Sequence, residues 1–100
     1  MARRILLSAR AQGWLRREVA YLTERGPTAA RRLLVRIEDA RRLLAEFPRS
    51  GPPGLVPGTR RLVIPPYVLT YRSNGPDLEI IDIRHGRQAE TTVQNPGPPR

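Results

Sequence analysis

The spacing of apolar residues changes once along this chain, and this change constrains the fold more than any other feature. Up to residue 47, apolar side chains recur at the spacing of one face of a helix. From residue 59 onward they come in short β-branched runs separated by turn residues. The segment between them, PRSGPPGLVPG (48–58), is rich in proline and glycine. The sequence therefore predicts a helical half followed by a sheet half.

The first half predicts two helices, over residues 9–26 and 28–47. Ser8 is a favourable N-cap for the first helix, and Gly26 with Pro27 ends it. Because so few residues join the helices, they must pack antiparallel, as a hairpin. The apolar stripes comprise Ala11, Leu15, Val19 and Leu22 in the first helix, and Ala30, Leu33, Leu34, Ile37, Leu44 and Phe47 in the second.

The second half predicts three strands, over residues 59–64, 67–72 and 78–83. Asn74-Gly75, before the third strand, is a strong hairpin signal, and the short connections predict an antiparallel meander.

One further strand is expected before the helices, over residues 3–8, and the sequence does not say which later strand it pairs with. The order β-α-α-β-β-β predicts an α+β fold, with the helical hairpin packed on one face of an antiparallel sheet. We expect residues 1–88 to form a single domain and residues 89–100 to form a flexible tail.

Composition limits the partners and the chemistry. The net charge is +9, and all 18 basic residues are arginine, which indicates an anionic partner such as nucleic acid or an acidic protein segment. With no cysteine and one histidine, we expect neither a metal centre nor another cofactor. No apolar segment has the length of a membrane span, and the start lacks a signal-peptide pattern. We therefore expect a cytoplasmic protein without membrane contact.

Three groups of polar residues lie at predicted strand ends. They are Arg60 with Arg61, then Tyr67, Tyr71 and Arg72, then Arg84, His85 and Arg87. Guanidinium groups bind phosphate, tyrosine stacks on bases and histidine titrates near neutrality, so converging groups could hold RNA. We expect the first and third groups to meet at one edge of the sheet. Each group also has a simpler structural explanation. Arg60 and Arg61 are typical of a solvated strand entrance, Tyr67 and Tyr71 of half-buried sheet residues, and His85 of a turn. These patterns alone predict a small basic α+β domain with an anionic partner.

The chain resembles the RelE/ParE superfamily of toxins from type II toxin–antitoxin modules. The resemblance rests on YLTERGPTAARRLLVRIEDARRLLAEFPRSG, VPGTRRLVIPPYVLTYR and LEIIDIRHGRQ, within which the Pro-Gly-Thr-Arg-Arg, Tyr-x-x-x-Tyr-Arg and Arg-His-Gly-Arg patterns are the most specific. It implies the fold described above. It also implies a growth-inhibiting toxin that is neutralised by a small antitoxin encoded beside it.

The superfamily contains two main activities. RelE-like members cleave mRNA on the ribosome, whereas ParE-like members poison DNA gyrase. RelE-like toxins carry an arginine after the first tyrosine of the central strand, and this chain has Val68 there. If the chain were an RNase, the resemblance would give Arg61, His85 and Arg87 as its catalytic set. We favour the ParE-like branch, which needs no catalysis. An mRNA endonuclease and an inactive homologue or nucleic-acid-binding module remain alternatives.

This interpretation predicts two interaction sites. Gly86 would turn the backbone so that Arg84, His85 and Arg87 point one way. A ParD-like antitoxin with an acidic amphipathic segment would dock on the helices and add a strand to an open sheet edge, forming a hetero-oligomer. The residues expected to recognise gyrase, or alternatively the ribosome and mRNA, are Arg60, Arg61, Tyr71, Arg72, Arg84, His85 and Arg87. The residues expected to bind the antitoxin are Trp14, Leu15, Leu22, Leu33, Ile37 and Leu44.

Overall fold

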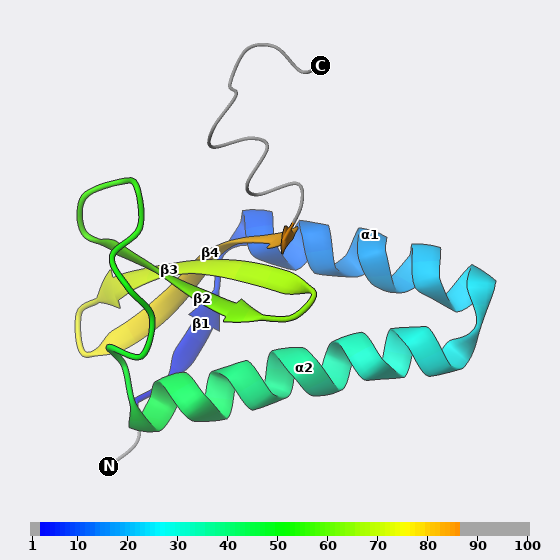
Figure 1. Cartoon of the computed structure of the whole chain (residues 1–100), viewed down its shortest axis with the longest axis horizontal. Helices are drawn as coiled ribbons and strands as arrows, with labels where there is room; N and C mark the ends of the chain where they lie inside the picture. Colours follow the sequence, from blue (N-terminus) through cyan, green and yellow to red (C-terminus); the bar gives the residue numbers. More distant parts are fainter. Residues whose placement is uncertain (1–2, 87–100) are drawn as a thin grey trace, which may run out of the picture.

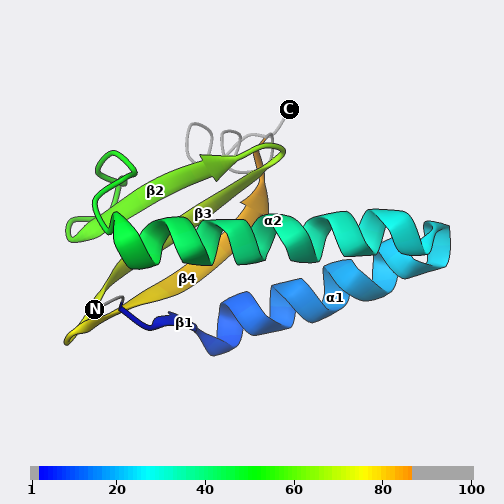
Figure 2. The ribbon, with the colours of Figure 1, turned by 90° about the horizontal axis from the view of Figure 1, so that it is seen from below.

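The computed structural model describes residues 3–86, and it confirms the predicted α+β class and element order. Both helices lie on one face of a four-stranded sheet (Figures 1 and 2). The expected tail, residues 89–100, lies outside the described residues. The elements are β1 (Ile5–Leu7), α1 (Ala9–Arg25), α2 (Pro27–Glu46), β2 (Thr59–Ile64), β3 (Tyr67–Asn74) and β4 (Asp77–His85).

The strand order in the sheet is β1-β4-β3-β2. Strands β2, β3 and β4 form the predicted antiparallel meander. Strand β1, whose partner the sequence left open, pairs in parallel with β4, with Ile5 opposite Leu78. The sheet is therefore mixed, because the helical hairpin returns the chain so that β4 runs alongside β1 in the same direction.

Strand β4 contains a bulge that the alternation of apolar residues did not reveal. Tyr71 pairs with Ile80 and Thr70 pairs with Asp82, so Ile81 is an extra residue on β4. Ile80 and Ile83 are consequently both fully buried, although side chains separated by an odd number of positions normally point to opposite faces.

The ends of the helices follow the expected capping chemistry. The Ser8 hydroxyl accepts a hydrogen bond from the Ala11 N–H at 3.1 Å, which confirms Ser8 as the N-cap of α1. Gly26 closes α1, and its N–H donates to the Leu22 carbonyl at 2.9 Å. Pro27 is the first residue of α2, where its lack of an N–H leaves no donor unsatisfied. The two helices therefore fold back on each other, as the hairpin prediction required.

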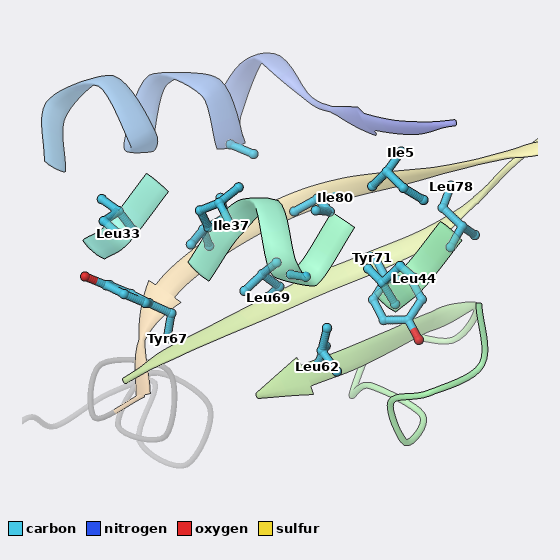
Figure 3. Close-up of a cluster of buried hydrophobic side chains, with 13 residues drawn as sticks. Ile5, Leu33, Ile37, Leu44, Leu62, Tyr67, Leu69, Tyr71, Leu78 and Ile80 are labelled. Carbon is cyan, nitrogen blue, oxygen red and sulfur yellow. The ribbon is translucent and has the colours of Figure 1, made fainter. Parts of the chain in front are cut away.

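The core lies between α2 and the inner face of the sheet (Figure 3). Leu33 and Tyr67 lie at one end of it, and Leu44 and Tyr71 lie at the other. Helix α1 contributes one fully buried side chain, Ala11, because the joined ends of the helices extend beyond the sheet (Figure 2). Trp14, Leu15, Val19 and Leu22 of this helix are only partly buried. No helix in residues 3–86 combines the length and apolar character needed to cross a membrane.

The loop between α2 and β2, residues 48–58, covers the outer edge of β2 where that strand begins. The Arg61 N–H donates to the Pro52 carbonyl at 2.9 Å, and the Gly51 N–H donates to the buried Tyr71 hydroxyl at 3.1 Å. A Cβ on Gly51 would overlap the carbonyl group of Arg61, so only glycine fits there. A partner strand therefore cannot pair with this part of the edge while the loop is in place.

Candidate functional site

Arg84 and His85 are placed on opposite faces of the sheet by the end of β4. The strand runs two residues further than predicted, with Arg84 opposite Val68 and His85 opposite Tyr67. Tyr67 belongs to the core between sheet and helices, so His85 shares that side and Arg84 points to the other. The prediction that these side chains point one way is wrong, because an unbroken strand alternates its side chains. Arg87 lies outside the described residues.

Gly86, where a backbone turn was predicted, does not adopt the left-handed conformation that favours glycine. Its N–H donates to the Pro66 carbonyl at 2.7 Å. This bond joins the end of β4 to the turn between β2 and β3.

His85 is held by contacts with α1. Its Nε2 lies 3.1 Å from Oε2 of Glu18, and its ring centre lies 5.1 Å from that of Tyr67 and 6.4 Å from that of Trp14. The Trp14 and Tyr67 rings meet edge to face, with their centres 5.8 Å apart. A shallow depression of about 400 Å³ lies beside this cluster, lined by Trp14, Arg17, Glu18, Tyr21 and His85. The carboxylate fixes the imidazole, which joins the last strand to the first helix.

Tyr67 lies in the same cluster and has a perturbed acidity. Burial raises its pKa above the ordinary value of 10.0, the negative charge of Glu18 raises it further, and Arg36 opposes both effects. The phenol therefore stays protonated to a higher pH in the folded protein than in the unfolded chain.

A second hollow, of about 300 Å³, separates the helices from the turn between β2 and β3. It is lined by Leu22, Ala29, Arg32, Leu33, Arg36, Pro66 and Tyr67. We call it the hairpin cleft. Its floor is apolar, whereas Arg32 and Arg36 form no ion pair with any residue in the described part of the chain. Such a cleft suits an apolar side chain carried by an acidic segment.

The residues predicted to bind an antitoxin divide into two groups. Leu22 lines the hairpin cleft, Trp14 lines the depression beside His85, and Leu15 is partly buried against the core. The other three, Leu33, Ile37 and Leu44, are 1%, 4% and 0% exposed. Their prediction as contact residues is corrected, because core side chains cannot contact a partner in the folded protein.

The sheet face opposite the helices carries three of the predicted arginines, and we call it the open face. Arg84 donates from Nε to Asp82 at 2.7 Å, and Arg72 forms an ion pair with Glu79 at 3.1 Å. The Nε of Arg61 is buried and has no hydrogen-bond partner among residues 3–86. Acidic side chains therefore compensate Arg72 and Arg84 on this face, whereas Arg61 forms no ion pair among residues 3–86.

Arg60 and Tyr71 hold the loop in place and do not present a recognition surface. The Arg60 guanidinium donates to the Gly51 carbonyl at 2.6 Å, and Tyr71 is 1% exposed. The start of β2 lies beside the end of β3, whereas His85 lies beside the start of β3. The prediction that Arg60 and Arg61 meet Arg84 and His85 at one edge is thus wrong. Strands β2 and β4 run in the same direction, so the start of β2 and the end of β4 lie at opposite ends of the sheet.

Residues 5–90 match the family model described as the ParE toxin of type II toxin–antitoxin systems, parDE. The chain belongs to the ParE toxin family. This membership confirms the resemblance to the RelE/ParE superfamily that the sequence patterns indicated.

Individual toxins and one solved structure are also similar to this chain. Y4kP of Sinorhizobium fredii is 42% identical over 71 residues, which cover 69% of this chain and 73% of Y4kP. Toxin RelE1 of Caulobacter vibrioides is 37% identical over 86 residues, covering 82% and 91% of the two chains. A structure titled "Chromosomal ParDE TA system from P. aeruginosa" matches with a TM-score of 0.70 at 22% identity, covering 84% and 96%. The fold is therefore shared with a ParDE structure, and both branch names occur among the matches.

Several residues of these surfaces were missed from the sequence. Glu18 follows Trp14 by about one turn of α1, and Arg32 and Arg36 are spaced by one turn of α2 beside Leu33. These spacings could be read from the sequence. The sequence does not show, however, which surface of the folded protein each arginine belongs to. No three His, Asp or Glu side chains in residues 3–86 could hold a metal ion together.

Proposed function

We propose that this protein is the toxin of a type II toxin–antitoxin module and arrests bacterial growth by inhibiting DNA gyrase in the cytoplasm. A small ParD-like antitoxin neutralises it. The toxin acts by binding a protein target and not by catalysis.

The separation of Arg61 from His85 carries this proposal. RNA cleavage through the ribose 2′-hydroxyl requires a base, an acid and cations around one phosphate. Arg61 projects from the open face, whereas His85 projects toward the helices and is engaged by Glu18. Val68, where RelE-like toxins carry an arginine, lies on the open face and supplies no charge. Of the RNase residues named from the resemblance, Arg61 and His85 are therefore not gathered around a common point.

A ribosome-dependent mRNA endonuclease is the second candidate. It is favoured by the similarity to Toxin RelE1 and by the position of Arg61 on the open face, where a guanidinium could pair with a phosphate. Under this alternative the ribosome would have to supply the groups that the toxin lacks near Arg61.

The antitoxin is proposed to insert an acidic amphipathic segment into the hairpin cleft. An apolar side chain would cover Leu22 and Ala29, and carboxylates would pair with Arg32 and Arg36. This arrangement uses the side of the molecule that the helices form and leaves the open face free. Because the loop occupies the start of the β2 edge, docking in the cleft is favoured over strand addition there.

Controlled induction in bacteria tests the proposed target. Cells are sampled within minutes for DNA breaks, new protein synthesis and intact mRNA. Double-strand breaks and filamentation before any loss of translation are expected. Prompt translation arrest with cleaved mRNA and intact DNA would instead support the endonuclease. Co-expression of the antitoxin should abolish either effect.

A further inference from the structure

The loop of residues 48–58 carries two aliphatic side chains at its tip that the described part of the chain does not cover. Leu55 is 69% exposed and Val56 is 64% exposed. No ionisable residue lies between Arg49 and Arg60, although 27% of the chain is charged. Loops that only face solvent are ordinarily polar, so an uncharged aliphatic tip indicates contact with an apolar surface.

Hydrogen bonds hold this tip in one conformation. The Gly54 N–H donates to the Thr59 carbonyl at 2.8 Å, while the N–H and hydroxyl of Thr59 both donate to the Val56 carbonyl, at 3.1 and 2.6 Å. A Cβ on Gly54 would overlap the Thr59 hydroxyl, and Gly58 has a φ of 86°. The bracing bonds come from backbone atoms and Thr59, so they do not depend on the aliphatic side chains. A preordered loop loses little conformational entropy when a partner binds it.

The position of the loop separates it from the proposed antitoxin site. The loop is attached at the start of β2, whereas the hairpin cleft includes Pro66, just beyond the end of β2. In Figure 1 the loop projects from the sheet on the side away from α2. Arg61, on the open face, is directly hydrogen-bonded to the loop through its N–H. A partner that covered both would meet aliphatic carbon beside a guanidinium.

We propose that Leu55 and Val56 insert into an apolar pocket, bordered by carboxylates, on the protein that this toxin inhibits. The inference rests on the proposed function, in that the toxin acts by binding a protein target. Carboxylates beside the pocket would pair with Arg61, and the aliphatic pair would provide the anchor. A nucleic acid would require cations at the tip, where the chain has none.

The test compares two pairs of the same residue types. Leu55→Ala/Val56→Ala removes the tip, and Leu34→Ala/Val35→Ala removes an adjacent leucine and valine from α2 that are 47% and 54% exposed. We expect the tip variant to lose growth arrest at equal expression and to bind purified DNA gyrase about tenfold more weakly or worse. Thermal unfolding and antitoxin binding should match the wild type. The helix variant should behave as the wild type in every assay.

Each other result has a defined meaning. Full growth arrest by the tip variant, or equal loss in both variants, would overturn the inference. Wild-type toxin that arrests growth without binding gyrase would contradict the proposed target, whereas a selective loss of arrest in the tip variant would still support the anchor. If the tip variant is less stable, Leu55→Asn, which keeps the side-chain size, replaces it. Sedimentation of wild type with anionic vesicles, lost in the tip variant, would identify a membrane instead and overturn the protein pocket.

Discussion

Arg84 and His85 are adjacent in the sequence, but their side chains leave opposite faces of the sheet. Arg84 lies on the open face, bound to Asp82, and His85 lies against α1, bound to Glu18. The two faces therefore present different chemistry to partners. We propose that the inhibited target binds the open face and that the antitoxin binds the hairpin cleft, so variants on the two faces should fail in different assays.

Neutralising the open face should lower toxicity. Arg61→Gln/Arg84→Gln removes two charges from this face, and we expect growth arrest at equal expression to weaken at least about tenfold, as when interface charges are lost. Arg16→Gln/Arg31→Gln removes the same charge from the helices and should remain toxic. Survival after induction provides the measurement. Unchanged killing by the first variant would show that the open face does not contact the target.

Reversing charge in the hairpin cleft should affect only the antitoxin. Arg36→Glu places a carboxylate where an acidic segment is expected to bind, so affinity for the antitoxin should fall by about a factor of ten or more. Arg31→Glu makes the same change on α2 at a residue that does not line the cleft. Titration calorimetry with the purified antitoxin separates the two. Equal affinities of both variants would remove the cleft as the docking site.

Leu44 and Leu43 are consecutive residues of α2 with opposite environments, at 0% and 38% exposed. Leu44→Ala should lower the free energy of unfolding by about 2–5 kcal/mol, because it leaves a cavity in the core. Leu43→Ala should lower it by less than about 1 kcal/mol. Urea denaturation measures both changes. A small effect at Leu44 with lost antitoxin binding would restore it as a contact residue and contradict its place in the core.

The raised pKa of Tyr67 predicts a loss of stability in alkaline solution. Above the ordinary pKa of 10.0 the unfolded chain releases the phenolic proton, while the folded protein, with its raised pKa, retains it. The unfolded state then binds fewer protons, so the free energy of unfolding falls as the pH rises. Tyr67→Phe removes the phenol and should reduce this fall. Denaturation series from pH 8.5 to about 11 provide the comparison. If the free energy of unfolding fell equally with pH in the wild type and in Tyr67→Phe, the proposed role of Tyr67 would be refuted.

The order of elements was predictable because apolar periodicity and turn residues are local signals. Ser8, Gly26 and Asn74-Gly75 each marked a boundary near where the structure has one. The pairing of β1 was not predictable, since it depends on contacts between residues more than seventy positions apart, such as Ile5 with Leu78.

The candidate site was harder to predict than the fold. Strand β4 continues through Arg84 and His85 because both residues pair with β3. Polar residues do not carry the apolar alternation that would have predicted this extension of the strand. Tyr71 resembled a recognition residue, but its hydroxyl is satisfied by the Gly51 N–H, a donor in a distant loop. Which arginine faces which partner depends on tertiary contacts, so composition indicated an anionic partner without locating it.

Purified toxin, DNA gyrase and plasmid DNA provide the most direct test of the central claim, which is that this protein inhibits a protein target without chemistry of its own. We expect the toxin to block supercoiling and to accumulate linear plasmid in a gyrase-dependent manner, and we expect stoichiometric antitoxin to prevent both. Gyrase that works normally with excess folded toxin, while the same preparation cuts mRNA on translating ribosomes, would contradict the account.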